Sequence, residues 1–187
     1  MFKRLFILLY RFISEPAATW RNVSEESDHQ NENFYKNYLF PIFGIIALLA
    51  FIGGLWAVKA PDWTPLLKNV MKQILVYGGG FFISSYAISE FLFPQVGIAK
   101  NRLLSERFTG YASSLLFVVA MFKMLFPSLF FLEWILLYTF YMLWQGGIAF
   151  LKIEEEQMVK LTIAAGLIII LPPMLFRWII ELLMPNF

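Results

Sequence analysis

Five long and almost uninterrupted apolar stretches constrain this chain more than any other feature of its sequence. A helix needs about 20 mainly apolar residues to cross the hydrocarbon core of a membrane. The stretches that reach this length are Leu39–Val58, Val70–Phe93, Thr109–Phe126, Ser128–Phe150 and Leu161–Leu183. Because the runs are continuous rather than alternating, helices that satisfy their own backbone hydrogen bonds are favoured over strands. The sequence therefore predicts an all-α polytopic integral membrane protein, a bundle of five transmembrane helices.

The overall composition agrees with this interpretation. Hydrophobic residues occupy 59% of the 187 positions and aromatic residues 19%, whereas charged residues occupy 15%. A soluble domain of this length could not bury so many apolar side chains, so part of the surface must face lipid. The formal net charge of +2 is too small to indicate a protein that binds nucleic acid.

The sequence carries no pattern typical of catalysis. It has no Ser-His-Asp set, no P-loop, no dinucleotide-binding glycine pattern and no zinc-ligand spacing. Cysteine is absent, which excludes a disulfide framework and a thiolate metal site. We therefore predict a protein that is not an enzyme and that has no catalytic, cofactor-binding or metal-binding residues.

Residues 1–38 precede the first apolar stretch and are predicted to form cytoplasmic amphipathic helices and a linker. On a helical wheel, Lys3, Arg4 and Arg11 share one face of a first helix, and mostly apolar side chains cover the rest. This pattern is typical of a helix that lies in the membrane interface with its basic edge toward anionic headgroups. The same helix could equally pack on the transmembrane bundle, and the sequence leaves both arrangements open.

Pro16 divides this N-terminal region into two helices. A proline disfavours helical geometry at the residue before it and suits the first position of a new helix. The second helix carries Thr19 and Trp20, and we expect Trp20 to anchor at the level of the lipid headgroups. The two helices would then form an interfacial elbow ahead of the five-helix domain, residues 39–187.

The distribution of positive charge predicts the orientation in the membrane. Ten Lys and Arg residues fall on one side of the five crossings and three on the other, and the richer side is expected to be cytoplasmic. The richer side holds Lys3, Arg4, Arg11, Arg21, Lys36, Lys100, Arg102, Arg107, Lys152 and Lys160, and the poorer side holds Lys59, Lys68 and Lys72. We therefore predict a cytoplasmic N-terminus and an external C-terminus.

Ionisable residues at membrane depth are the first candidates for a functional site, since each costs about 2.5–3.5 kcal/mol at a helix centre. They are Lys72, Glu90, Lys123, Glu133, Arg177 and Glu181. All six fall near predicted helix ends, five of them at the outer ends, so snorkelling of the side chains to the interface would account for each. Glu106, by contrast, is expected to be a solvated loop residue.

Small and polar residues also align along the predicted helices, and such stripes usually mark faces turned toward other helices. The aligned residues are Lys72, Gly79, Tyr86 and Glu90 in the second crossing, Thr109, Ser113, Ala120 and Lys123 in the third, Trp134, Tyr138, Tyr141 and Gln145 in the fourth, and Thr162, Gly166, Pro173, Arg177 and Glu181 in the fifth. They would serve equally well as packing seams and as pathways for a solute. Gly78–Gly80 is interpreted as a site of close packing or of a kink.

Three segments, taken in order, resemble a known family. The first is "SEPAATWRNVSEE" with Pro16, Thr19 and Trp20, followed by "FTGYASSLLFVVAMFKMLFP" and "LLYTFYMLWQGGIAFLKIEEEQMVKL". Together with the five apolar stretches, they are similar to the Ypt-interacting-protein (YIP) family, particularly its short bacterial-type members. The eukaryotic branch of that family binds Rab-type GTPases through a longer N-terminal region and an Asp-Leu-Tyr-Gly-Pro-type element. This chain lacks both, so the resemblance implies a bacterial cytoplasmic membrane and does not imply Rab binding.

Two functions remain as hypotheses at this point. The first is a non-enzymatic scaffold that organises the membrane or recruits a partner, with anionic lipid at its N-terminus and a protein partner or a second copy at its cytoplasmic loops. The second is a small transporter or channel subunit that uses the intramembrane polar stripes. A water-filled cavity touching Glu90, Lys123 or Arg177 would favour the second hypothesis, and a dry, close-packed bundle would favour the first.

Overall fold

The computed structural model describes residues 2–25, 34–57, 63–129 and 131–183, and every regular element within them is helical. The elements of the bundle are η2 (Tyr35–Leu39), α4 (Phe40–Ala57), α5 (Trp63–Ile74), η3 (Leu75–Gly79), α6 (Gly80–Ala87), η4 (Ile88–Leu92), α7 (Phe93–Gln95), α8 (Arg102–Ala112), α9 (Ser114–Leu125), α10 (Leu132–Ile135), α11 (Tyr138–Gly146), η5 (Gly147–Leu151) and α12 (Glu155–Leu183). Two further helices, α1 (Phe2–Ser14) and α2 (Pro16–Glu25), precede them. The predicted all-α class is confirmed.

Four continuous helical segments are long and apolar enough to cross a membrane: Tyr35–Trp56, Trp63–Gln95, Leu132–Leu151 and Glu155–Leu183. The third predicted crossing is instead a bent pair, because α8 and α9 meet at an angle of 47° around Ser113. The described residues therefore contain four candidate spans, or five if the bent pair counts as one.

The predicted helix limits were too narrow in several places. Helices predicted to begin at Val70, Thr109 and Leu161 begin instead at Trp63, Arg102 and Glu155. The added turns are amphipathic or charged, such as the segment WTPLLKNVMKQI of α5. Hydropathy detects only the apolar part of such a helix, so its polar turns were assigned to loops. Val58 and Lys59 lie outside the described residues.

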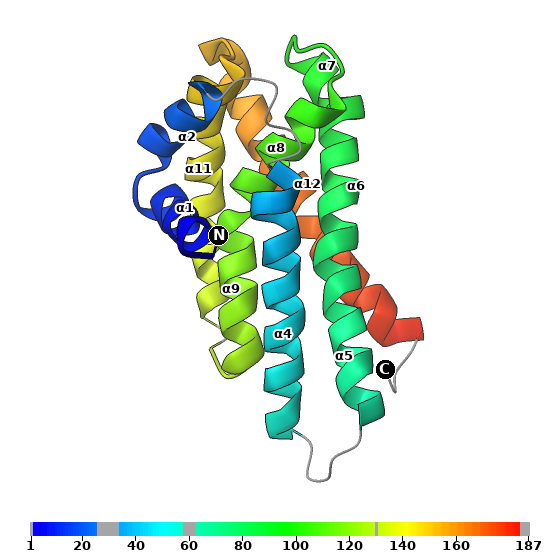
Figure 1. Ribbon diagram of the computed structural model, residues 1–187. Coiled ribbons are helices and arrows are strands. Elements are labelled where there is room, and N and C mark those ends of the chain that lie inside the picture. The colour runs from blue at the N-terminus through cyan, green and yellow to red at the C-terminus, as the bar shows by residue number, and fades with distance from the viewer. Residues whose placement is uncertain (1, 26–33, 58–62, 130, 184–187) are drawn as a thin grey trace.

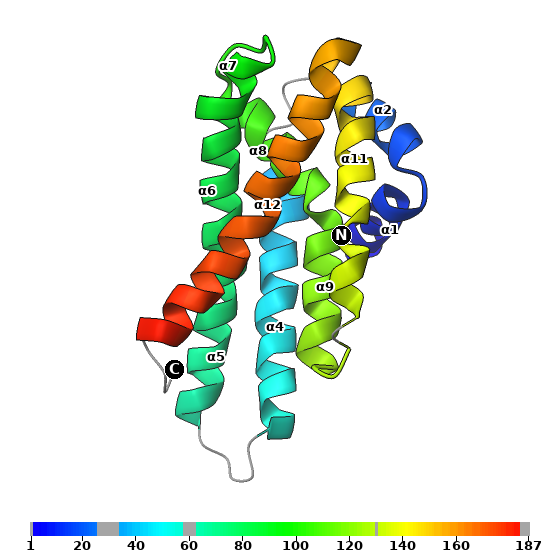
Figure 2. The same ribbon diagram turned by 180° about the vertical axis from the view of Figure 1, so that it is seen from behind.

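The long helices run side by side between two ends of the molecule (Figure 1). We call the end that carries α2, α7 and the start of α12 the upper end, and the end where α4 and α9 finish the lower end. Helix α12 crosses the back of the bundle diagonally, from beside α11 at the upper end to beside α5 at the lower end (Figure 2). The C-terminal half of α12 is therefore separated from α9 and α10 by the width of the bundle's lower end.

The close approach of α12 to the second span depends on glycine. A Cβ atom added to Gly80 would lie 2.7 Å from Cγ of Pro173, and one added to Gly79 would lie 3.3 Å from the ring of Phe176. Proline in a helix is tolerated where neighbouring helices compensate for the lost backbone bond. The interpretation of Gly79 and Gly80 as close-packing residues agrees with these contacts.

Helices α1 and α2 pack on the upper half of the bundle. Leu5, Leu9 and Phe12, spaced one helical turn apart, are buried, and the ring of Phe12 stacks on Tyr111 with centroids 5.0 Å apart. The hydroxyl of Tyr138 donates to the carbonyl of Ile13 at 3.0 Å. Of the two arrangements left open for α1, the structure shows packing on the bundle.

Trp20 is the centre of this attachment. Its side chain is fully buried, its ring lies 5.6 Å from Phe108 and 5.2 Å from Phe150, and its Nε1 donates to the carbonyl of Met142 at 3.0 Å. Gly146 makes room for it, since a Cβ atom there would lie 2.8 Å from the indole. The expectation that Trp20 sits among lipid headgroups was therefore wrong: the indole has an interior hydrogen-bond partner and needs no interfacial one.

We predict that Trp20→Ala destabilises the protein by about 3–5 kcal/mol, because it removes a fully buried aromatic side chain and leaves a cavity. The measurement is the unfolding temperature of the detergent-solubilised protein. Trp134→Ala is the matched control, since Trp134 is 74% exposed. Equal unfolding temperatures for the two variants would contradict the buried position of Trp20.

Candidate functional site

The lower end of the bundle brings charged residues from four helices together. Nζ of Lys72 on α5 donates to Oε1 of Glu181 on α12 at 2.9 Å, although the two residues are 109 positions apart in the chain. Lys123 on α9 forms an ion pair with Glu133 on α10. The structure pairs these four residues with one another, and their snorkelling to the membrane interface stays a prediction. Pairing lowers the cost of charge at membrane depth.

Arg177 completes this group of charges. One of its guanidinium nitrogens donates to the hydroxyl of Tyr77 at 3.0 Å. Among the described residues, no carboxylate lies within ion-pair distance of Arg177, because Glu133 and Glu181 pair with the two lysines. These five residues comprise three cations and two carboxylates, and Arg177 is the one of the three cations that has no carboxylate partner within the described residues.

Two cavities adjoin the charged residues. The first, which we call the side groove, has a volume of about 380 Å³ and lies between α12, α9 and α10. The second, which we call the end vestibule, has a volume of about 550 Å³ and lies between α4, α5 and α9. Tyr77, Ala120, Lys123 and Arg177 line both cavities, so the two meet at the cations. Volumes of this size fall within the range of small-molecule sites, about 300–1,000 Å³.

The side groove is mainly apolar. Leu137, Met174 and Trp178 form part of its rim and are each about 60% exposed, which places this rim on the lateral surface of the bundle. Its floor is formed by buried residues of α9, such as Leu116 and Val119. Helix α12, which forms one wall of the groove, runs diagonally across the back of the bundle (Figure 2).

The end vestibule is more polar. Asn69 and Gln73, one turn apart on α5, line it with Tyr77, and Nε2 of Gln73 donates to Oδ1 of Asn69 at 3.3 Å. Asn69 in turn donates to the carbonyl of Ala50 at 2.9 Å. Oε1 of Gln73 is buried and has no hydrogen-bond partner among the described residues. An unpaired buried acceptor is unfavourable, and a bound water or ligand would normally satisfy it.

Glu90 lies at the opposite end of the molecule from this group. It pairs with Lys100 at 2.5 Å, and the hydrogen bond and negative charge of Glu90 raise the pKa of Lys100. A raised lysine pKa means that the pair contributes to stability at neutral pH and is lost only as the pH rises above the usual lysine range. Neither cavity is lined by Glu90.

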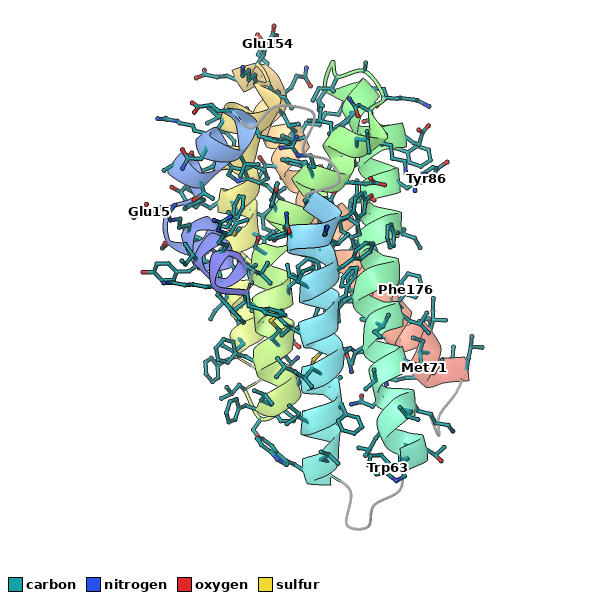
Figure 3. All side chains as sticks on the ribbon, viewed as in Figure 1. Glu15, Trp63, Met71, Tyr86, Glu154 and Phe176 are labelled. Atoms are coloured by element: carbon teal, nitrogen blue, oxygen red, sulfur yellow. The ribbon has the colours of Figure 1, made fainter. Side chains whose placement is uncertain are left out.

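Two of the four predicted stripes turn inward only in part. In the second span, Gly79 packs on the ring of Phe176, whereas Tyr86 projects away from the bundle (Figure 3) and is 56% exposed. Trp134 and Tyr141 of the fourth stripe are 74% and 47% exposed, and Gln145 is half-buried. The stripes of the third and fifth spans do turn inward, with Thr109, Ser113, Ala120, Thr162, Gly166 and Pro173 all buried.

The N-terminal candidates divide into buried and exposed residues. Pro16 and Thr19 are buried with Trp20, and Oγ1 of Thr19 donates to the carbonyl of Glu15 at 2.8 Å. Lys3, Arg4 and Arg11 are exposed on α1. Pro16, Thr19 and Trp20 thus form a packing element, and contact of the three basic residues with lipid headgroups stays a prediction.

The expectation that Glu106 is a solvated loop residue was wrong. Its side chain is only 4% exposed, accepts a hydrogen bond from Nε of Arg102 at 2.9 Å and also accepts one from the hydroxyl of Tyr35. The adjacent Arg107 is buried, donates to the carbonyl of Val23 at 3.2 Å and lies over the ring of Phe150. The segment that reads as a charged loop is in fact the first turns of α8, packed inside the upper end.

Sequence reasoning missed three residues of the vestibule, namely Asn69, Gln73 and Tyr77. They recur at intervals of four residues, which places them on one face of a helix. The signal was present, but the predicted second crossing began at Val70 and left Asn69 outside it.

Neither a metal site nor a related protein explains this arrangement. Among the described residues, no group of three His, Cys, Asp or Glu side chains could hold a metal ion. Comparison with protein-family models, with curated proteins and with solved structures found no match to this chain. The function is therefore argued from the lower end itself.

We predict that the charges at the lower end stabilise the contact between α5 and α12. Lys72→Glu places two carboxylates together and should lower the unfolding temperature, whereas the double variant Lys72→Glu, Glu181→Lys restores the pair and most of the stability. The coupling free energy should be about 1 kcal/mol in a double-mutant cycle on the solubilised protein. Additive effects of the two substitutions would show that the pair does not form.

Proposed function

We propose that this protein is a non-enzymatic integral membrane protein that binds a small ligand in the hollow formed by the side groove and the end vestibule. The observation that supports this proposal is the meeting of the two cavities at Lys123 and Arg177. Of the two hypotheses drawn from the sequence, a cavity that touches these residues favours the small transporter or channel subunit, which would use the intramembrane polar residues, over the scaffold. A solute that the protein takes up would first bind in this same hollow.

The hollow is better suited to binding than to free passage. Its lining residues all come from the lower half of the bundle. Above it, the contact between the second span and α12 is closed by a hydrogen bond of 2.5 Å from Ser84 to the carbonyl of Ile168. Ser105 donates to the carbonyl of Ser85 at 2.5 Å in the same region. A transported solute would require these helices to separate.

The proposal includes a membrane topology. The bent pair α8 and α9 would be the third of five crossings, the upper end would face the cytoplasm and the lower end would face outward. The excess of Lys and Arg in the upper segments supports this orientation. The resemblance to the short bacterial-type YIP proteins supports a place in a bacterial cytoplasmic membrane, with the hollow opening on the external side.

The absence of native cysteine makes the topology easy to test. Ser128→Cys lies at the lower end and Glu154→Cys at the upper end, and both positions are exposed. An impermeant thiol reagent added to intact cells should label Ser128→Cys and should label Glu154→Cys only after the membrane is opened. The reverse pattern would refute the proposed orientation.

The hollow itself should be accessible to water. Met124 lines the end vestibule and is half-buried, whereas Met142 is fully buried in the upper half. In the purified protein, Met124→Cys should react with a thiosulfonate reagent, and Met142→Cys, the matched control, should not. The anionic form of the reagent should react faster than the cationic form, because Lys123 and Arg177 attract anions. Equal protection of both cysteines would remove the basis of the proposed function.

One observation favours the scaffold as a second candidate. Attachment of α2 through Trp20 fixes the exposed Arg21 and Asn22 beside the exposed loop that contains Lys152 and Glu154. A rigid polar surface of this kind suits a partner protein or a second copy of the chain. A photoreactive residue at Asn22 that captured nothing in membranes would argue against this candidate.

A further inference from the structure

We propose that the occupant of the hollow is an anionic glycerophospholipid with hydroxyl groups in its headgroup, drawn from the membrane leaflet at the lower end. The phosphate would lie between Lys123 and Arg177, the headgroup in the end vestibule and part of an acyl chain in the side groove. This inference rests on the proposed function, because it takes the hollow to be a binding site and adds the class of ligand.

The charge of the site calls for one negative charge. Lys123, Arg177, Glu133 and Glu181 line the side groove. Glu181 pairs with Lys72 and Glu133 pairs with Lys123, so Arg177 is left without a carboxylate partner within the described residues. Arg177 hydrogen-bonds the neutral hydroxyl of Tyr77 and keeps further guanidinium donors available. A phosphate diester carries one negative charge and several acceptor oxygens, which a guanidinium binds well.

The shape of the hollow favours a lipid over a free anion. The vestibule is lined by polar groups of Asn69 and Gln73, and the side groove, which shares Lys123 and Arg177 with it, is lined mainly by apolar residues. The groove reaches the lateral surface through the exposed side chains of Leu137, Met174 and Trp178. A ligand that fills both cavities must be amphiphilic, with its charged part at the junction.

The vestibule also discriminates between headgroups. Oε1 of Gln73 is a buried acceptor without a partner in the described part of the chain. A hydroxyl group of a glycerol headgroup would donate to it, whereas a choline headgroup has no donor. Choline would also place a quaternary cation beside Lys123 and Arg177. Phosphatidylglycerol should therefore bind in preference to phosphatidylcholine.

The test is lipid binding by the purified full chain in detergent, measured by native mass spectrometry with phosphatidylglycerol or phosphatidylcholine added. Wild-type protein should retain phosphatidylglycerol preferentially. Arg177→Gln should weaken that binding about tenfold, as expected for the loss of a charged hydrogen bond. Arg177→Lys should recover part of it, and Arg4→Gln, which removes an exposed cation elsewhere, should leave it unchanged.

Three results would overturn the inference. Equal binding of the two lipids would contradict headgroup recognition, and equal loss of binding in Arg177→Gln and Arg4→Gln would show nonspecific attraction to the surface. Displacement of the lipid by glycerol phosphate at similar concentration would identify a free anion as the ligand. In each case, labelling of Met124→Cys separates the two proposals. If Met124→Cys reacts but lipid binding is not selective, the proposed function stands and the lipid inference fails. If Met124→Cys does not react, both fail.

Discussion

The pairing of ionised side chains between helices is the main polar interaction in the lower half of this molecule. Lys72, Lys123, Glu133, Arg177 and Glu181 lie there on four different helices, and each would be unfavourable alone in hydrocarbon. The pairs Lys72–Glu181 and Lys123–Glu133 join α5 to α12 and α9 to α10. Helix α12 reaches α5, where the first pair forms, by crossing the back of the bundle diagonally (Figure 2). The side groove lies between α12, α9 and α10, and Lys123, Glu133 and Glu181 of the two pairs line it.

The upper half is organised by packing rather than by charge. Trp20 fills the space above Gly146, and the rings of Phe108 and Phe150 surround it. Burial of such a large side chain in apolar surroundings adds several kcal/mol to the free energy of unfolding, about as much as its removal is expected to subtract. This contact attaches the first 25 residues to the bundle. The upper half is therefore tightly packed, and the lower half contains the two cavities. The proposed binding function requires both features.

The sequence allowed the helical class and most of the spans to be predicted, because long apolar runs leave few alternatives in a membrane. The faces of those spans were harder to predict. Tyr86 was placed in an inward stripe with Gly79, but the structure exposes Tyr86 although Gly79 packs on Phe176. Snorkelling was the simplest account of each charge taken singly, since partners such as Glu181 lie more than 100 positions away from Lys72. Asn69, Gln73 and Tyr77 could have been predicted from the sequence as one polar group, since they share one helical face.

The central claim is that the lower end contains an open hollow where Lys123 and Arg177 meet. An experimental structure by electron cryomicroscopy, with the full chain in nanodiscs containing phosphatidylglycerol, tests this most directly. We expect α12 to diverge from α9 and α10, with elongated density in the side groove and its headgroup end between the two cations. A structure in which α12 closes against α9 and α10, so that Lys123 and Arg177 no longer share a cavity, would contradict the account.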